Sequence, residues 1–334
     1  MQIICCIGLD IEIGLFEEVI GMNIVIVVNK ERGDLLQQET AKKLKDKLEA
    51  QGVLVNIVDL TFENPNTRYY DSFPRIKPES IFHADGVIVL GGDGSKNYIA
   101  NQMIHYNISI PMIGVTHGSH NVGKLNTAVL TDFDEFEKMT ERWVSGLKVQ
   151  VDDSIYYAFH DIIFASTFIT GYEGKSTQLS AKLIMDGVRK IEAPKLIGDS
   201  ETNIEVIRGD GSISKMPIFD PVGLISSAEL GIYPKYMVIS GAANHPINEG
   251  AQAGVIVSSE RIVWPDRSLE EYTKAEPIIT AFASYSNKDV LHIKGLNNDA
   301  YLIIDGNAVC PVGHRDIKIS NKANAIKIKE LVSK

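Results

Sequence analysis

The run Gly86-Val87-Ile88-Val89-Leu90-Gly91-Gly92-Asp93-Gly94 constrains the fold of this chain more than any other feature. The four branched aliphatic residues 87–90 predict a strand that is buried on both faces. Three glycines in four positions follow at once, and residues 95–106 favour a helix. Ligands of open α/β sheets bind at the carboxyl ends of the strands, where glycines and a helix N-terminus suit a phosphate. The sequence therefore predicts a phosphate-binding loop at residues 91–94.

Asp93 is the unexpected member of this loop, because a carboxylate repels a phosphate unless it has another task. Such a group can take a proton from an attacking hydroxyl or organise a magnesium ion. The alternative is a plain strand-to-helix turn in which Asp93 or Ser95 caps the helix. Three glycines are entropically costly in a plain turn, which favours the functional interpretation.

Strand and helix patterns alternate through the first part of the chain. Such β-α-β units imply a parallel sheet with right-handed crossovers. We therefore expect an α/β nucleotide- and phosphate-binding domain with a Rossmann-like parallel sheet over residues 1–146. The predicted strands lie at 24–28, 53–60, 86–90 and 111–115, and the predicted helices at 39–51, 95–106 and 133–144.

The second half has a different character, because short alternating strands and turn residues dominate it. It predicts a β-rich, antiparallel, sandwich-like domain over residues 147–334, in which substrate binds, with one helical segment. Its expected elements are a strand at 161–169, a helix at 179–188, a turn at 305–307, and strand pairs 204–207 with 212–218, 291–293 with 301–304, and 317–319 with 325–328.

Length, charge and cysteine usage exclude several classes of protein. The 334 residues exceed one ordinary core, and the net charge of -10 disfavours nucleic acid and anionic membranes as partners. No apolar run reaches the roughly 18 residues of a membrane span, and residues 1–20 lack the features of a signal peptide. Three cysteines without framework spacing, Cys5, Cys6 and Cys310, indicate a reducing compartment. We expect a soluble cytoplasmic protein.

The glycine-rich run resembles the corresponding motif of NAD kinases and diacylglycerol kinases, a superfamily that includes kinase-like proteins linked to acetoin catabolism. A second resemblance follows at the appropriate distance. Residues 110–115 look like the strand that leads to a second glycine-bearing loop, which here contains Gly118, Ser119 and Asn121. This Gly-Ser-x-Asn is closer to the lipid-kinase and acetoin-type versions than to that of NAD kinases.

Two further segments resemble the family, and some features depart from it. His160-Asp161 stands where NAD kinases carry an Asn-Glu or Asn-Asp pair that contacts the substrate nucleotide, with His160 in place of the asparagine. Residues 301–307 look like a strand and turn of the family's β domain. The Gly-Ser-Thr-Ala-Tyr loop of NAD kinases has only a poor counterpart at residues 240–244, and Ser95 replaces the usual threonine.

The resemblance implies a kinase that transfers the γ-phosphoryl of ATP, or sometimes of polyphosphate, to a hydroxyl with a divalent cation such as Mg2+. NAD is the first acceptor that it suggests; a lipid, a polyol, another small alcohol or a non-catalytic regulatory role are the alternatives. It makes Asp93 the catalytic candidate and implies a homo-oligomer assembled through the β domain. The expected binding residues are Gly91, Gly92, Gly94, Ser95, Gly118, Ser119, Asn121, His160 and Asp161.

Two other motifs are weaker. Residues 171–176 resemble a P-loop, but their glycines are three apart instead of five, so a plain turn before a capped helix fits better. His117 and His120 lack the neighbouring cysteines or carboxylates of a zinc site, and contact with the ligand of the adjacent loop is the better interpretation.

Overall fold

A computed structural model describes residues 21–28, 35–59, 81, 83–116, 123–172, 175–217, 220–227, 253–259 and 279–331. Cys5 and Cys6 lie outside these residues. The first half of the chain forms β1 (Asn23–Val28), α1 (Leu35–Glu49), β2 (Leu54–Asp59), β3 (Gly86–Gly91), α2 (Asp93–His105), β4 (Met112–Thr116), the 3-10 helix η2 (Leu130–Lys138) and β5 (Thr140–Val151).

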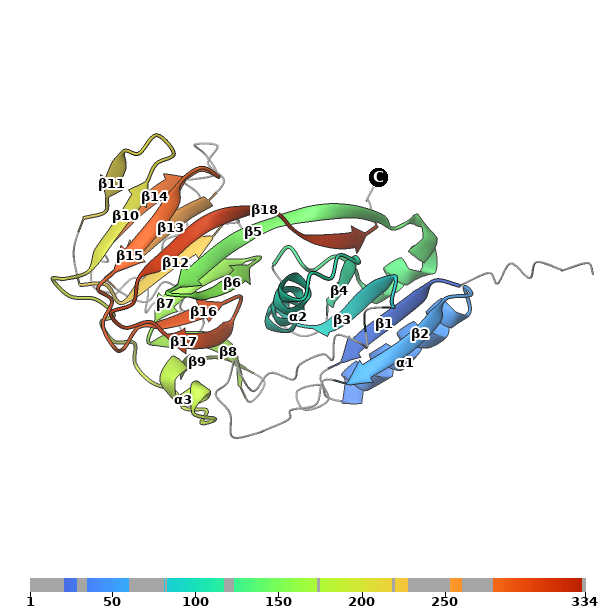
Figure 1. Cartoon of the computed structure of the whole chain (residues 1–334). Helices are drawn as coiled ribbons and strands as arrows, with labels where there is room; N and C mark the ends of the chain where they lie inside the picture. Colours follow the sequence, from blue (N-terminus) through green and yellow to red (C-terminus); the bar gives the residue numbers. More distant parts are fainter. Residues whose placement is uncertain are drawn as a thin grey trace, which may run out of the picture.

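A parallel sheet in the order β2-β1-β3-β4 organises this half, as predicted. Its central strands are buried on both faces because their residues alternate between two hydrophobic clusters. Ile24 and Ile88 face the cluster that contains α1 and η2, whereas Val25 and Val87 face the cluster that contains α2. The sheet therefore lies between α1 with η2 on one side and α2 on the other (Figure 1).

The predicted helix at 133–144 is wrong. The amphipathic signal belongs to η2, which buries Phe133 and Phe136 and ends at Lys138. From Thr140 the chain is extended instead, because β5 pairs antiparallel with the last strand of the chain over its whole length. This long-range pairing overrides the local helical pattern, and β-formers such as Trp143 and Val144 suit it.

The second half forms a β-sandwich, as predicted. A six-stranded sheet in the order β14-β13-β12-β7-β16-β17 packs against the antiparallel part of a ten-stranded sheet. The bounds are β6 (Ser154–Ala158), β7 (Asp161–Ala165), β8 (Thr167–Tyr172), β9 (Lys175–Ser180), α3 (Ala181–Met185), β10 (Asn203–Ile207), β11 (Ile213–Lys215), β12 (Gly223–Ser227), β13 (Ala253–Ser258), β14 (Thr280–Tyr285), β15 (Val290–Lys294), β16 (Tyr301–Ile304), β17 (Asn307–Pro311) and β18 (Ile317–Glu330).

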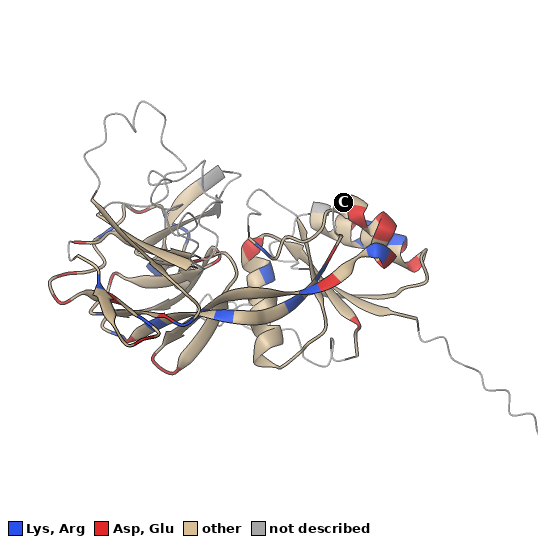
Figure 2. Ribbon diagram, turned by 90° about the horizontal axis from the view of Figure 1, so that it is seen from above, with Lys and Arg blue, Asp and Glu red and all other residues tan. Residues whose placement is uncertain are grey.

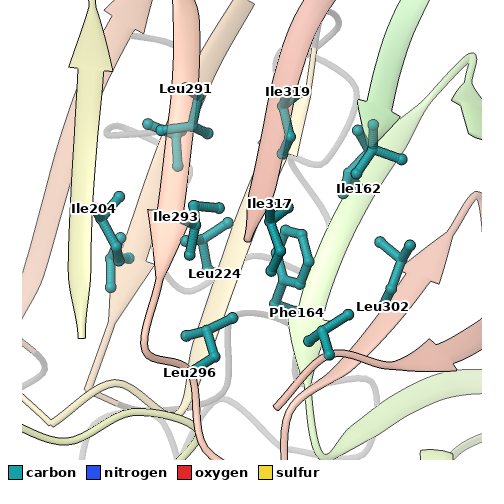
Figure 3. Packing of buried hydrophobic residues seen from close by; sticks show 14 of the residues in the cluster. Ile162, Phe164, Ile204, Leu224, Leu291, Ile293, Leu296, Leu302, Ile317 and Ile319 are labelled. Atoms are coloured by element: carbon teal, nitrogen blue, oxygen red, sulfur yellow. The ribbon is translucent and has the colours of Figure 1, made fainter. Parts of the chain in front are cut away.

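The sandwich core is built from alternate residues of the two facing sheets. Figure 3 shows Leu291, Ile293 and Ile319 from one sheet facing the layer that contains Phe164 and Leu224 of the other. All five side chains are completely buried.

The predicted strand pairs have mixed outcomes. The hairpin β10–β11 and the turn at 305–307 between β16 and β17 are confirmed. Residues 317–319 and 325–328 do not pair with each other, because both belong to the single strand β18. Likewise β15 and β16 lie in different sheets, since β15 pairs with β10 and β18 whereas β16 pairs with β7 and β17. Residues 171–176 include the ends of the hairpin β8–β9, so they do not precede a helix directly.

The long strands β5 and β18 connect the two halves. They pair from Thr140 opposite Glu330 to Val151 opposite Ile317, and Figure 1 shows them arching from the parallel sheet to the sandwich. At one end β18 pairs in parallel with β4, and at the other it pairs antiparallel with β15. The domain division at residue 146 stays a prediction, and β5 runs continuously across that position.

Both signs of charge lie side by side around α1 and η2 (Figure 2), where Lys47 pairs with Asp134 at 2.6 Å and Lys138 pairs with Glu135 at 2.7 Å. Lys318 and Lys322 of β18 are exposed, whereas Lys329 near its end is buried. In the described part of the chain, no helix is both long and apolar enough to cross a membrane.

Candidate active site

The glycine-rich run joins β3 directly to α2 at the carboxyl edge of the parallel sheet. Gly91 ends β3, Gly92 is the residue before the helix, and Asp93 is the first helical residue. A Cβ at Gly91 would lie 2.9 Å from the Cβ of Ser95, so a larger residue would push the helix away from the strand. The glycines therefore let α2 begin at the edge of the sheet, where its N-terminus favours an anion.

Asp93 does not cap its own helix, which excludes the capping interpretation for this residue. Its Oδ2 accepts a hydrogen bond of 3.2 Å from the backbone N–H of Gly123, and its Oδ1 accepts one of 2.5 Å from Nδ2 of Asn126. Both donors belong to the segment that follows β4. These two bonds fix the orientation of the carboxylate.

A buried lysine lies beside this aspartate. Lys96 has no exposed surface, and its Nζ donates to Oδ1 of Asn126. Burial lowers the pKa of Lys96 to about 8, and the charge of Asp93 opposes that fall. Asn126 therefore connects Lys96 to Asp93.

The sandwich reaches the same place through the turn between β6 and β7. A Cβ built on Gly123 would lie 3.3 Å from Cβ of His160 and 3.5 Å from Cγ of Asp93, so these two residues flank Gly123. His160 and Asp161 are both buried, and His160 Nε2 lies 3.9 Å from Asp161 Oδ2. The predicted catalytic residue of the first half thus lies close to the predicted nucleotide contact of the second half.

Asp305 holds this turn in position. Its carboxylate accepts backbone N–H bonds from Phe159 at 2.8 Å and from His160 and Asp161 at 2.9 Å, and a further bond of 2.8 Å from Asn97 Nδ2 on α2. Burial, with the Asp161 carboxylate adding to it, raises the pKa of Asp305 to about 7. The carboxylate thereby ties α2 to the sandwich.

Asn307 makes a second tie between the sandwich and α2. Its Nδ2 donates to the backbone oxygen of Gly94 at 2.9 Å, and a Cβ on Gly94 would lie only 2.6 Å from Asn307 Oδ1. Glycine is therefore needed at position 94 because two distant parts of the chain approach each other closely there.

Sequence reasoning placed several of these residues and missed others. Gly91, Gly92, Asp93, Gly94 and Ser95 lie together at the start of α2, and His160 lies against Gly123, which also neighbours Asp93. The predicted contacts Gly118, Ser119 and Asn121, the histidines His117 and His120, and residues 240–244 lie outside the described residues. Those missed are Lys96, Asn97, Asn126, Asp305 and Asn307.

Signals for the missed residues existed but were weak. Lys96 and Asn97 are polar residues directly after the glycine motif on a helix that packs against a sheet, and residues 305–307 were recognised only as a turn. Only the fold brings them to the site.

Among the described residues, no three histidine, cysteine or acidic side chains form a group that could hold a metal ion. Magnesium that is already bound to ATP needs no such cage, because phosphates and water supply most of its ligands.

Several known proteins are similar to this chain. Residues 23–152 match the diacylglycerol kinase catalytic domain. An uncharacterized protein of Archaeoglobus fulgidus is 25% identical over 312 residues, which cover 90% of this chain and 96% of the relative. The crystal structure of yeast NADH kinase complexed with NADH matches with a TM-score of 0.50 and 12% identity, over 94% of this chain and 84% of that chain.

A diacylglycerol kinase from Bacillus anthracis strain Sterne matches with a TM-score of 0.48 and 14% identity, over 92% of this chain and 96% of that chain. The yeast structure has the same fold, a parallel α/β part followed by an antiparallel β-rich part. Residues 23–152 are thus similar to the catalytic domain of diacylglycerol kinases, on a fold that the chain shares with yeast NADH kinase.

Proposed function

We propose that this protein is a phosphotransferase that moves the γ-phosphoryl group of magnesium-bound ATP to a hydroxyl group, with NAD as the first acceptor to test. The observation that carries this proposal is the position of Asp93. It stands at the N-terminus of a helix that suits phosphates, its orientation is fixed by two donors, and the His160-Asp161 turn lies across Gly123 from it.

The donor phosphates would lie against the glycine-rich loop. The N-terminus of α2 suits an anion, and Gly91, Gly92 and Gly94 would permit its close approach. Ser95 adds a hydroxyl on the first turn. Phosphoryl transfer depends mostly on positioning and charge stabilisation, which such a loop supplies.

Asp93 would act on the acceptor. Its carboxylate takes the proton of the attacking hydroxyl as that oxygen forms a bond to the γ-phosphorus and the bond to the β-phosphate oxygen breaks, so that ADP leaves. The hydrogen bonds from Gly123 and Asn126 keep the carboxylate in position during this step.

The acceptor would be held by the sandwich. His160 and Asp161 supply polar side chains on a turn whose backbone N–H groups are held by the Asp305 carboxylate, and a nucleotide ribose offers hydroxyls to such side chains. The similar yeast structure is a kinase for a nicotinamide dinucleotide, which supports NAD as the acceptor.

A lipid or another small alcohol is the second candidate acceptor. The observation in its favour is the match of residues 23–152 to a diacylglycerol kinase catalytic domain. A third candidate is a non-catalytic regulator that binds nucleotide, and the histidine at position 160 favours it slightly.

The test is phosphoryl transfer from labelled ATP with magnesium to NAD, NADH, diacylglycerol in mixed micelles, or glycerol. We expect NADP from NAD, and an Asp93→Asn variant that is slower by about 10²- to 10⁴-fold, the usual contribution of a catalytic base. Asp46→Asn is the control, because Asp46 is an exposed aspartate of α1.

The outcomes separate the candidates. Product from diacylglycerol or glycerol alone would replace NAD as the acceptor. Nucleotide binding in calorimetry without any product would leave the regulatory role, and turnover that Asp93→Asn does not affect would reject the role of Asp93.

A further inference from the structure

Lys96 is a charged side chain in a place where an apolar one would fit. It has no exposed surface, and a Cβ built on Gly114 of β4 would lie 2.9 Å from its Cδ, so its stem packs against that strand. Burying an ammonium group costs several kcal/mol unless it is paired, so a hydrophobic residue of similar volume is often more stable. A role in the site would explain the lysine.

The contacts of Asn126 give the direction of its amide. An ammonium group can only donate, so the atom of Asn126 that faces Lys96 Nζ must be the carbonyl Oδ1. The Nδ2 group then faces Oδ1 of Asp93 and also donates to the backbone oxygen of Gly123 at 2.9 Å. Hydrogen bonds thus link the Lys96 ammonium, a cation, through the Asn126 amide to the Asp93 carboxylate, an anion.

We propose that Lys96 is a positioning residue, which through Asn126 keeps the Asp93 carboxylate correctly oriented for the transfer. This inference rests on the proposed function, because it assigns Asp93 the role of base. A neutral lysine would weaken the charge-assisted bond to Asn126 and thereby loosen Asp93. The low pKa of Lys96 places this change near pH 8.

The first arm of the test measures transfer in Lys96→Met, which keeps the length of the side chain and removes its charge. We expect kcat to fall about 10- to 100-fold, as for one lost charged hydrogen bond, while the KM for ATP changes little. Lys96→Arg should recover part of the loss. Lys329→Met is the matched control, because Lys329 is a buried lysine on β18 whose pKa is also lowered by burial.

The route through Asn126 has its own prediction. If Lys96 acts through Asn126, then Asn126→Ala and the double variant should each lose about as much activity as Lys96→Met. The activity of the wild type should decline above about pH 8, and this decline should be absent in Lys96→Met. Additive losses, or a pH profile that Lys96→Met shares with the wild type, would overturn the proposal.

The second arm needs no turnover. The folded pKa of Lys96 is below its ordinary value, so the unfolded chain binds more protons between about pH 8 and 10.5 and the wild type gains stability over that range. As the pH increases over this range, the urea midpoint of the wild type should therefore rise relative to that of Lys96→Met. In the Asp93→Asn background this rise should begin at a lower pH, because Asp93 no longer favours the charged lysine.

The two arms separate two kinds of failure. If no acceptor is phosphorylated but Asp93→Asn lowers the pH at which stability begins to rise, the proposed function fails and the coupling of Lys96 to Asp93 stands. If Asp93→Asn does not shift the rise, the positioning role of Lys96 is rejected even when the protein is an active kinase.

Discussion

Asp305 shows how one side chain can organise a site that it does not enter. Four N–H groups from two separate segments converge on its carboxylate, three from the β6–β7 turn and one from Asn97. Three of these are backbone groups, and a buried backbone donor without a partner is costly. Removing the carboxylate would therefore disturb the turn that carries His160 and Asp161.

The first prediction concerns the stability of Asp305→Asn at different pH values. The pKa of Asp305 is 3.8 unfolded and about 7 folded, so between these values the folded protein holds one extra proton. The stability that Asp305 contributes is therefore greatest near pH 4 and declines as the pH rises to about 7, by at most about 1.4 kcal/mol per unit. We expect urea unfolding to show this declining advantage of the wild type over Asp305→Asn.

Asp289 is a control whose contribution to stability should change with pH in the opposite direction. Burial raises its pKa, but hydrogen bonds from Ser286, Gly209 and Arg208 outweigh that effect, so its pKa is lower than usual. Its contribution is present above its unfolded pKa of 3.8 and is lost as the pH falls through the lower folded value. A constant difference between the wild type and Asp305→Asn from pH 4 to 7 would contradict the prediction for Asp305.

The residues that sequence reasoning found and missed differ in the range of their contacts. Asp93 was predicted because its neighbours in the sequence, the glycines and the flanking strand and helix, already define its environment. Lys96 meets Asn126 at a separation of 30 residues, and Asn97 meets Asp305 at a separation of 208. Such contacts are determined by the fold, so local patterns cannot reveal them.

The segment after β4 is held against that strand by backbone contacts. The backbone oxygen of Gly114 accepts bonds from the N–H groups of Thr127 at 2.9 Å and Ala128 at 3.2 Å. A Cβ on Gly114 would lie 1.6 Å from the backbone oxygen of Leu125. Only glycine at this position lets residues 123–128 come close enough to place Asn126 beside Asp93.

The second prediction is that Gly114→Ala lowers the free energy of unfolding by about 3 kcal/mol, because a backbone segment must move to make room. Nucleotide turnover should fall as well, since Asn126 moves with the segment. Denaturant unfolding and the transfer assay measure the two effects. Gly21→Ala is the control, as its Cβ would meet Gly52 O at 3.2 Å and little else, and an equal loss of stability in both variants would refute the argument.

The parallel sheet was predicted better than the pairing of β5 with β18. The strands β1, β3 and β4 of that sheet each carry their own run of buried apolar residues, so their local sequence pattern is sufficient. For β5 and β18 the partner lies far away in the sequence, and neither the helix expected at 133–144 nor the hairpin expected at 317–328 anticipated that pairing. Two short alternating runs in β18 look like two strands because a register shift lies between Lys322 and Ile326.

The two halves of the molecule share the pair β5–β18. The first half of β18 contributes Ile317 and Ile319 to the sandwich core, and its second half contributes Ile326 and Ile328 to the core around α2. A change in one core is therefore transmitted along a continuous hydrogen-bonded ladder to the other. We expect the two halves to unfold together.

The third prediction tests this joint unfolding with Ile319→Ala, which removes a completely buried side chain from the sandwich end of β18 and should cost about 2–4 kcal/mol. Trp143 reports the other end, because it lies opposite Lys327 with the ammonium 5.8 Å from its ring centroid. The chain has two tryptophans, so a Trp264→Phe background makes fluorescence specific to Trp143. The fluorescence and circular dichroism midpoints should fall together.

Ile155→Ala on β6 is the matched surface control, because it removes a side chain that is 46% exposed. With either probe, its free energy of unfolding should differ from that of the wild type by at most about 0.5 kcal/mol. If Ile319→Ala lowered the circular dichroism midpoint while the Trp143 transition stayed in place, the two cores would unfold separately. The ladder would then transmit no stability between them, and the contacts of Asp305 and Asn307 with α2 would have to keep the sandwich aligned with the glycine-rich loop without help from β5 and β18.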